Sequence, residues 1–209
     1  GDVYKRQVIQ NLFPDKNKDF VFNITENDIV LVKEVKNNID VRDLEKLARS
    51  ISDTLSSEFF TKVNVGIGTP VVGVKDLARS FKEAQTALEV GKVFDTDKNI
   101  VSYDNLGIAR LIYHLPTTLC ETFLKEVFKK NSIESLDHET LFTIQKFFEN
   151  SLNVSETSRK LFVHRNTLVY RLDKIKKLTG LDLREFDHAI IFKIALMVKK
   201  YLAANPTKF

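Results

Sequence analysis

The sequence predicts an α+β domain with a ferredoxin-like sheet, followed by an all-α domain. Three observations support this prediction. Runs of alternating or β-branched apolar residues, typical of strands, occur before residue 105. Helical patterns separate them in the order hairpin, helix, strand, helix, strand, which is typical of α+β folds. From Leu106 onward no strand pattern returns, and the apolar residues follow helical spacing.

The first domain is predicted from five elements. They are a hairpin over 19–35, a helix over 41–60, a strand over 63–67, a helix over 76–94 and a strand over 99–104. The hairpin turns at Thr25-Glu26-Asn27-Asp28, between two runs rich in β-branched and aromatic residues.

The second domain is predicted to be helical over 105–130, 139–150 and about 187–202, with further helical segments between the last two. "LPTT" at Pro116 interrupts the helical pattern and marks the boundary. The predicted segments are a cloning or assembly remnant (1–7), the first domain (8–115), a helical linker (116–138) and the second domain (139–205). "GDVYKRQ" is set aside because it joins no later pattern, in a chain whose only methionine is Met197.

Composition and charge narrow the class of protein. No apolar run approaches the roughly 20 residues that span a bilayer, so no membrane partner is expected. The single cysteine, Cys120, excludes an internal disulfide and a cysteine zinc cluster, and a buried thiol in a reducing cytoplasm is expected. From Asn153 onward, 12 Lys and Arg face 5 Asp and Glu, a balance of +7 within a chain of net charge +4. This basic end suggests a polyanionic partner.

Residues 152–180, "LNVSETSRKLFVHRNTLVYRLDKIKKLTG", have the pattern of a helix-turn-helix. Ser155 is the predicted N-cap of a short helix that runs to about Leu161. A tight turn then leads to a second helix from about His164, and Gly180 ends it as a C′ glycine.

The second helix of this motif has two distinct faces. At about 100° per residue, Leu168, Leu172 and Ile175 fall on one side and are predicted to face the core. Asn166, Tyr170 and Lys177 point the opposite way, flanked by Thr167 and Lys174. Asp173 also points outward, and we expect it to lie beyond a bound groove or to pair with Lys177.

The outward face carries the chemistry that recognises DNA. Asparagine can bind adenine, arginine can bind guanine with two hydrogen bonds, and hydroxyls and lysines suit phosphates. The alternative is a solvated amphipathic helix, which the capped short helix, the turn and the basic charge together disfavour. The candidate DNA-binding residues are Arg165, Asn166, Thr167, Tyr170, Arg171 and Lys174, with Ser155, Thr157 and His164 as secondary phosphate contacts.

Residues 153–183 resemble the C-terminal helix-turn-helix of PucR/CdaR-type transcriptional regulators, the purine-catabolism and sugar-diacid regulator family. "LFVHRNTL" followed by "YRL" and "LTGLDL" carries the resemblance. Ser158 stands where an alanine is usual, and Val169 where an arginine is common. Val169 is therefore not counted among the DNA contacts.

Residues 63–92 and 102–116 are similar to the GGDEF-like domain of these regulators. Diguanylate cyclases need a Gly-Gly-acidic-acidic-Phe hairpin so that the backbone approaches a nucleotide and carboxylates hold metal. The hairpin here turns at residues 25–28 without adjacent glycines. The expectation is a degenerate GGDEF-like fold without catalysis and without a cofactor or metal.

The resemblance implies a sequence-specific transcriptional regulator of a catabolic operon. Double-stranded operator or promoter DNA is the expected partner, and a homo-oligomer is expected. It also implies an N-terminal effector-sensing region, expected to be missing from this chain, that binds a small metabolite. The alternative is a nucleotide-binding or residual cyclase-type GGDEF protein with an accessory helical domain. A third interpretation makes the first domain a protein-interaction module alone.

Other candidate sites are weaker. Gly66, Gly68 and Gly73 lack the spacing of a dinucleotide or P-loop motif, so turn chemistry is favoured. The histidines never fall three to five residues apart, which argues against a local zinc pair. Glu26 and Asp28 are more simply solvated turn carboxylates than metal ligands.

Overall fold

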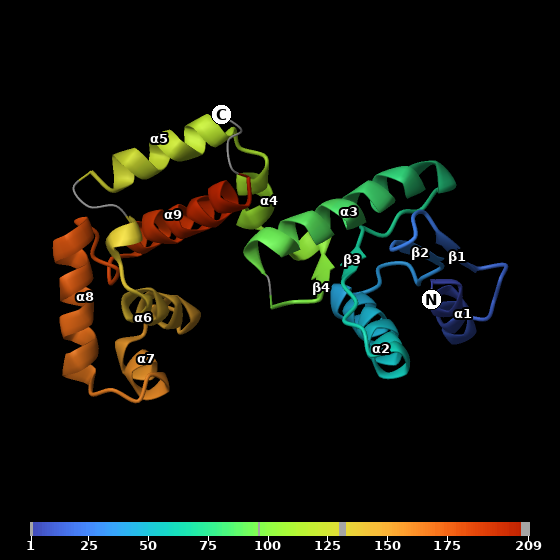
Figure 1. Cartoon of the computed structure of the whole chain (residues 1–209), viewed down its shortest axis with the longest axis horizontal. Helices are drawn as coiled ribbons and strands as arrows, with labels where there is room; N and C mark the ends of the chain where they lie inside the picture. The colour runs from blue at the N-terminus through green and yellow to red at the C-terminus, as the bar shows by residue number, and fades with distance from the viewer. Residues whose placement is uncertain (1, 96, 130–132, 206–209) are drawn as a thin grey trace. The chain divides into compact units, whose positions relative to one another are not determined.

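The chain folds into two compact units, residues 1–110 and 111–209 (Figure 1). In this computed structural model the described residues are 2–95, 97–129 and 133–205. Within those ranges, no helix is both long and apolar enough to cross a membrane. The division after Arg110 precedes the predicted boundary at residue 115.

The first unit contains the predicted order of hairpin, helix, strand, helix and strand, which confirms its α+β class. Its elements are α1 (Asp2–Leu12), β1 (Asp19–Asn23), β2 (Ile29–Lys33), α2 (Val41–Phe59), β3 (Val65–Ile67), η1 (Val74–Asp76), α3 (Leu77–Phe94), β4 (Ile100–Ser102) and η2 (Tyr103–Asn105). A short helix, α4 (Ile108–Tyr113), follows at the division between the units.

Strands β1 and β2 form the predicted antiparallel hairpin, with Phe20 opposite Val32. The turn between them is held by its own polar groups. The hydroxyl oxygen of Thr25 accepts hydrogen bonds from the backbone N–H groups of Asn27 (3.2 Å) and Asp28 (3.1 Å). This is the local bonding by which threonine favours turns.

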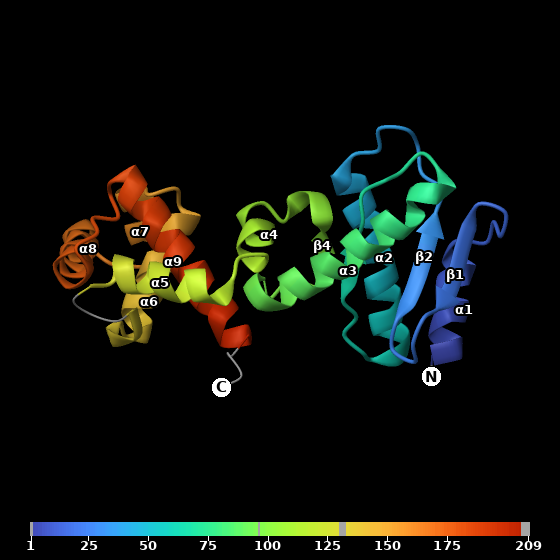
Figure 2. The same cartoon turned by 90° about the horizontal axis from the view of Figure 1, so that it is seen from above.

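The core of the hairpin region lies between α1, α2 and the two strands. Ile9 from α1 and Phe13, directly after that helix, meet Ile51 and Leu55 from α2, and all four side chains are buried. Figure 2 shows β1 and β2 side by side with α1 beside them. Burying these apolar surfaces is the main force that holds α1 in place.

Helix α1 differs from the sequence prediction. Residues 2–7 were set aside because they joined no pattern, but they form the first turns of α1. Val3 and Tyr4 are exposed, so this part of the helix has no continuous apolar stripe that periodicity could detect.

Strands β3 and β4 pair in parallel, with Val65 opposite Ile100 and Ile67 opposite Ser102, and α3 connects them. This pair is separate from the hairpin. The predicted single ferredoxin-like sheet is therefore replaced, within the described residues, by two sheets of two strands each. Strands β3 and β4 are three residues long, which leaves few backbone groups for a further partner.

Glycines 66 and 68 allow β3 to lie directly against α3. A Cβ added at Gly66 would sit 2.3 Å from the carbonyl oxygen of Ala84, and one at Gly68 would sit 2.0 Å from that of Ser80. Close approach of two backbones, rather than the predicted turn chemistry, accounts for these two glycines. A Cβ at Gly73 would meet nothing nearer than 3.7 Å.

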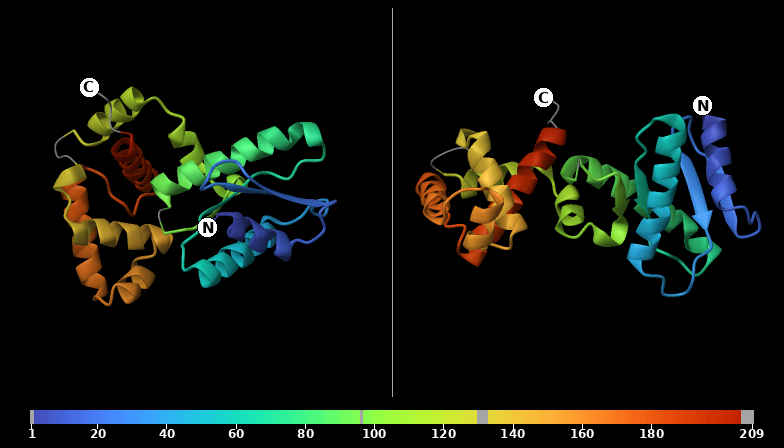
Figure 3. Two further views of the ribbon diagram at one scale, coloured as in Figure 1. Left: turned by 45° about the vertical axis from the view of Figure 1, so that its right-hand side comes forward. Right: turned by 90° about the horizontal axis from the view of Figure 1, so that it is seen from below.

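The second unit is all-α, as predicted. Its elements are α5 (Thr117–Val127), η3 (Ile133–Ser135), α6 (His138–Glu149), α7 (Val154–Lys160), α8 (Arg165–Thr179) and α9 (Phe186–Ala204). The buried core residues of this unit come from several of these helices and the segments between them, and Figure 3 gives two further views of the helices. They are Phe128, Ile133, Leu136, Ile144, Phe147, Leu168, Leu172, Ile175, Leu183, Phe192 and Ala195.

The segment predicted as a linker, residues 116–138, is part of this second unit. Helix α5 packs along α9, and Phe128 lies in the core with its ring 5.6 Å from that of Phe192. Cys120 is buried as predicted, and burial raises the pKa of its thiol. Helix α9 is apolar on most of its surface, so it needs apolar partners on several sides. The apolar residues of the segment predicted as a linker supply some of these partners.

Candidate nucleic-acid interface

Helix α7 opens the candidate interface, and its N-cap is Asn153 rather than the predicted Ser155. The side-chain oxygen of Asn153 accepts a hydrogen bond of 2.9 Å from the backbone N–H of Glu156. Asparagine and serine are comparable N-caps, so residue preference alone does not decide between these two positions. Ser155 lies inside the first turn of α7 and is exposed.

A tight turn joins α7 to α8, as predicted. Phe162 adopts the left-handed backbone conformation (φ +55°) and its side chain is 95% exposed. The backbone N–H of Phe162 donates to the carbonyl of Arg159 (3.1 Å), and that of Val163 donates to the carbonyl of Ser158 (3.0 Å). These bonds satisfy the last carbonyls of α7 and direct the chain into α8.

His164 is the N-cap of α8, which confirms its predicted place at the helix start. Its ring nitrogen Nδ1 accepts a hydrogen bond of 3.2 Å from the backbone N–H of Asn166. At the other end Gly180 adopts φ +79° and its N–H donates to the carbonyl of Lys176 (2.8 Å). The predicted C′ role of Gly180 is therefore confirmed.

The inner face of α8 is formed by Leu168, Leu172 and Ile175, each at most 1% exposed. The face predicted from helical spacing is confirmed. Burial of these three side chains fixes the rotation of α8 about its own axis, and with it the residues that point outward.

The first half of α8 exposes most of the predicted DNA-binding groups. Arg165, Asn166, Thr167 and Tyr170 are all exposed, with Tyr170 70% accessible to solvent. Within the described residues, no hydrogen bond or ion pair engages the Arg165 side chain. Lys174, in the second half of the helix, is also exposed. The pKa of the Asp137 carboxyl is lowered mainly by a hydrogen bond from Thr140, and the nearby charge of Lys174 lowers it further.

Arg171 has a different role from the one predicted. Its Nη1 donates to the hydroxyl of Thr143 (3.1 Å), and its Nη2 donates to the carboxylate of Glu139. Both partners lie on α6, and the Arg171 side chain is only 26% exposed. The guanidinium ties α8 to α6, so it is not available for a groove as the spacing had suggested.

Thr157 is also excluded as a phosphate contact. It is fully buried, and its hydroxyl donates to the carbonyl of Asn153 (2.7 Å). Helix α7 has only seven residues, too few for helical spacing to separate its inner face from its outer face. The burial of Thr157 could therefore not be predicted from the sequence.

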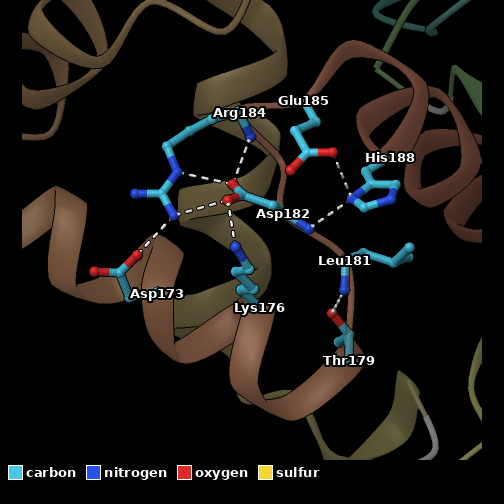
Figure 4. Close-up of polar contacts among 8 residues, drawn as sticks. All are labelled: Asp173, Lys176, Thr179, Leu181, Asp182, Arg184, Glu185 and His188. Carbon is cyan, nitrogen blue, oxygen red and sulfur yellow. Dashed lines mark hydrogen bonds and ion pairs between the residues drawn. The ribbon is translucent and has the colours of Figure 1, made fainter.

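Asp173 pairs with Arg184 rather than with the predicted Lys177. Nη2 of Arg184 lies 2.6 Å from the Asp173 carboxylate, as Figure 4 shows. Arg184 is itself held by Asp182, which accepts from its Nε (2.8 Å) and its backbone N–H (3.1 Å). Arg184 and Asp182 were not among the predicted site residues, although they lie in the "LDLR" stretch directly after the C′ glycine.

Asp182 is the centre of this network. Its side chain is 9% exposed and also accepts a hydrogen bond from Lys176 (3.1 Å). Hydrogen bonds from Arg184, in the first place, hold the pKa of the Asp182 carboxyl well below its usual range. The backbone N–H of Asp182 donates to Nδ1 of His188 (3.1 Å), which joins the loop after α8 to α9 (Figure 4).

Residues 140–198 match the PucR C-terminal helix-turn-helix domain, and residues 5–90 match the GGDEF-like domain. Both matches are to domains of PucR/CdaR-type regulators, so each part of the chain is similar to that family. The first match contains the whole of α7 and α8, and the second contains the hairpin, α2 and most of α3.

Proteins of similar sequence include two that are named as regulators. The chain is 28% identical over 199 residues to the carbohydrate diacid regulator of Escherichia coli, covering 92% of this chain and 51% of the relative. It is 26% identical over 150 residues to the purine catabolism regulatory protein of Bacillus subtilis, covering 71% and 28% respectively. The chain thus spans about half the length of the first relative, and less of the second.

Among solved structures, the chain aligns with a regulator of polyketide synthase expression from Bifidobacterium adolescentis. The sequence identity is 18% and the TM-score 0.38, with 94% of this chain and 74% of that one covered.

The hairpin turn of the GGDEF-like domain shows no metal-binding geometry. The Asp28 carboxylate accepts a hydrogen bond from the Thr25 hydroxyl (2.7 Å). Across residues 2–95, 97–129 and 133–205, no three His, Cys, Asp or Glu side chains gather in a way that could hold a metal ion.

Proposed function

We propose that this chain is a sequence-specific DNA-binding transcriptional regulator, and that α8 enters the major groove of double-stranded DNA. The observation that carries the proposal is the first half of α8. There a capped helix start exposes Arg165, Asn166, Thr167 and Tyr170 above an inner face that is completely buried. A helix face that contacts only water would not need to be held this rigidly, and would not need this set of groups.

Each exposed group has a role in the proposed complex. Asn166 would bind adenine and Arg165 guanine, each with two hydrogen bonds, because their geometries match those base edges. The hydroxyls of Thr167 and Tyr170 and the ammonium of Lys174 would contact phosphates. His164 and Ser155 remain candidates for phosphate contacts at the start of α8 and α7. Thr157 and Arg171 are left out because their polar groups are used inside the unit.

The names of the relatives suggest which kind of genes this chain controls. Two of them are named a carbohydrate diacid regulator and a purine catabolism regulatory protein. We therefore propose that this chain controls a catabolic operon in response to a small metabolite. The effector would act through the part of such proteins that lies outside the region this chain covers.

The GGDEF-like domain is proposed to relay or dimerise rather than to catalyse. Its hairpin turn, residues 25–28, has no adjacent glycines, and its one bonded carboxylate is used to close the turn. Helix-turn-helix proteins commonly bind two half-sites as dimers, so a homo-oligomer is proposed. A regulator of this kind works beside the chromosome, which suggests the cytoplasm.

DNA binding can be tested by fluorescence anisotropy with duplexes from the region upstream of the gene. Binding should weaken as salt rises, because each neutralised phosphate releases counterions. Asn166→Ala should relax base preference, whereas Lys174→Ala should weaken binding to all sequences and reduce the slope of log affinity against log salt by about 1.

Lys193→Ala provides the matched control, since Lys193 is an exposed lysine on α9, outside the helix-turn-helix. It should leave both base preference and most of the salt slope unchanged. Binding that does not depend on salt, or no binding by a folded chain, would contradict the proposed function.

Incubation with GTP and Mg²⁺ tests the alternative of cyclase activity in the GGDEF-like domain. We expect no turnover, measured by chromatography of the nucleotides. Formation of a cyclic dinucleotide would replace the non-catalytic role proposed for this domain.

A further inference from the structure

Asp173 lies in the same line of side chains as the proposed base contacts. The outward row of α8, Asn166, Tyr170, Asp173 and Lys177, follows helical spacing of three and four residues. Every member of the row is exposed, and the Asp173 side chain is 57% exposed. An uncompensated carboxylate in this row would face the phosphates on either side of the groove and oppose binding.

Arg184 compensates that charge. Its Nη2 lies 2.6 Å from Asp173, and the contact spans eleven positions of the sequence from α8 to the loop before α9 (Figure 4). It is the one ion pair of Asp173 among the described residues. Lys177, the cation that neighbours Asp173 in the row, does not bond with it.

The position of Arg184 is set by Asp182. The Asp182 carboxylate accepts from the backbone N–H, from Nε and from Nη2 of Arg184, the last at 3.0 Å. This bonding orients the guanidinium plane, so that Nη2 can reach Asp173. Arginine can form such a fork with two carboxylates, whereas lysine presents a single point charge.

Charge accounting separates the two roles of Arg184. Asp182 has a second cation, Lys176, at 3.1 Å, so it keeps one partner if Arg184 is lost. Asp173 would keep none among the described residues. Removing Arg184 would therefore leave one exposed negative charge in the outward row, and would also weaken the loop that Asp182 organises.

We propose that Arg184 is a positioning residue that masks Asp173 and so allows the outward row of α8 to approach the phosphates of DNA. The inference rests on the proposed function. In the folded chain Asp182 positions the arginine, and Arg184 cancels the charge of Asp173. The one acid of the outward row then no longer opposes the phosphates.

Charge-matched variants test the masking role. Arg184→Gln should bind a mixed-sequence DNA duplex about threefold to tenfold more weakly near 50 mM salt, because it unmasks one carboxylate and removes one cation. Arg184→Gln combined with Asp173→Asn should restore the affinity of the unaltered chain. The two substitutions together leave the net charge unchanged.

Arg184→Gln combined with Asp187→Asn is the matched control. Asp187 is an exposed acid in the first turn of α9, so this pair has the same net charge but leaves Asp173 unmasked. It should not restore affinity. Both double variants lose the Arg184 bonds to Asp182, so both should show a similar decrease in melting temperature.

Equal affinities of the two double variants would overturn the inference, because the effect would then come from net charge or from stability alone. If the unaltered chain and Arg184→Gln bind equally well, the inference is also overturned while DNA binding stands. Failure of the unaltered chain to bind DNA in a salt-dependent way would instead overturn the proposed function, and this inference with it.

Discussion

The two halves of α8 treat their charged side chains in different ways. In the first half, Arg165 is exposed and no bond engages its side chain within the described residues. In the second half, Arg171, Asp173 and Lys176 are bonded to residues of α6 or of the loop before α9. The first half is available to a partner, whereas three charged side chains of the second half hold the helix on its unit.

This difference shows that a position on the helix surface does not by itself make a side chain available. Arg165 and Arg171 lie at comparable angles on opposite edges of the buried face, and the same long side chain leads to opposite roles. The deciding feature is what lies across from each edge. Glu139 and Thr143 of α6 lie beside Arg171.

The largest expected effect concerns the contacts that hold the second half of α8 on its unit. Asp182→Asn should lower the free energy of unfolding by about 2 kcal/mol at pH 7, because charge-assisted hydrogen bonds to Arg184 and Lys176 weaken. The folded-state pKa of Asp182 lies below its unfolded value. This contribution is therefore present above the unfolded pKa of about 3.9 and is lost as the pH falls below it.

Urea unfolding of the unaltered chain and of Asp182→Asn, at several pH values from 7 to 3, measures this contribution to the free energy of unfolding. The difference in stability should narrow as the solution becomes acidic. Asp187→Asn, at an exposed site on α9, should show little difference at either pH. A difference for Asp182 that did not change with pH would mean that packing, and not charge, accounts for it.

The next effect contrasts the two arginines directly. Arg171→Gln should lower the free energy of unfolding by about 1 kcal/mol, since it breaks the bonds to Glu139 and Thr143. Arg165→Gln should change stability by less than about 0.5 kcal/mol but weaken specific DNA binding about tenfold. Thermal unfolding and anisotropy measured on the same samples give both quantities.

An Arg171→Gln variant with full stability and reduced DNA affinity would remove the distinction between the halves. Such a result would restore Arg171 to the set of DNA contacts that the spacing had suggested.

The smallest effect concerns the start of α7. Asn153→Ala should lower the free energy of unfolding by about 1 kcal/mol, the usual contribution of an N-cap. The reason is that the backbone N–H of Glu156 loses its acceptor. Ser155→Ala should be nearly neutral for stability, because its side chain does not cap the helix. Denaturant titration of both variants compares them, and a larger cost at Ser155 would contradict the assignment of the cap.

Sequence analysis was most reliable where the structure depends on neighbouring residues. The turn at residues 25–28, the buried face of α8 and the C′ role of Gly180 all follow from local bonding or from helical spacing. Each was predicted and confirmed. The element order of the first unit was predicted in the same way, although the pairing of its strands into two sheets was not.

Prediction failed where a residue depends on a partner distant in the sequence. The close approach of Gly66 to α3, the packing of α5 against α9 and the bonds of Arg171 to α6 all involve such partners. The N-cap of α7 is a different failure, since Asn153 and Ser155 were both suitable locally and only the start of the helix decides between them.

The amino-acid sequence by itself determined the two kinds of domain, the helix-turn-helix and the residues of α8 that point away from the core. Those properties follow from periodicity, turn chemistry and capping, which act over a few residues. The tertiary structure alone decided which outward groups are still available. Arg171 and Asp173 are bonded by α6 and by Arg184, and such pairs form only after burial of the apolar face has brought distant parts of the chain together.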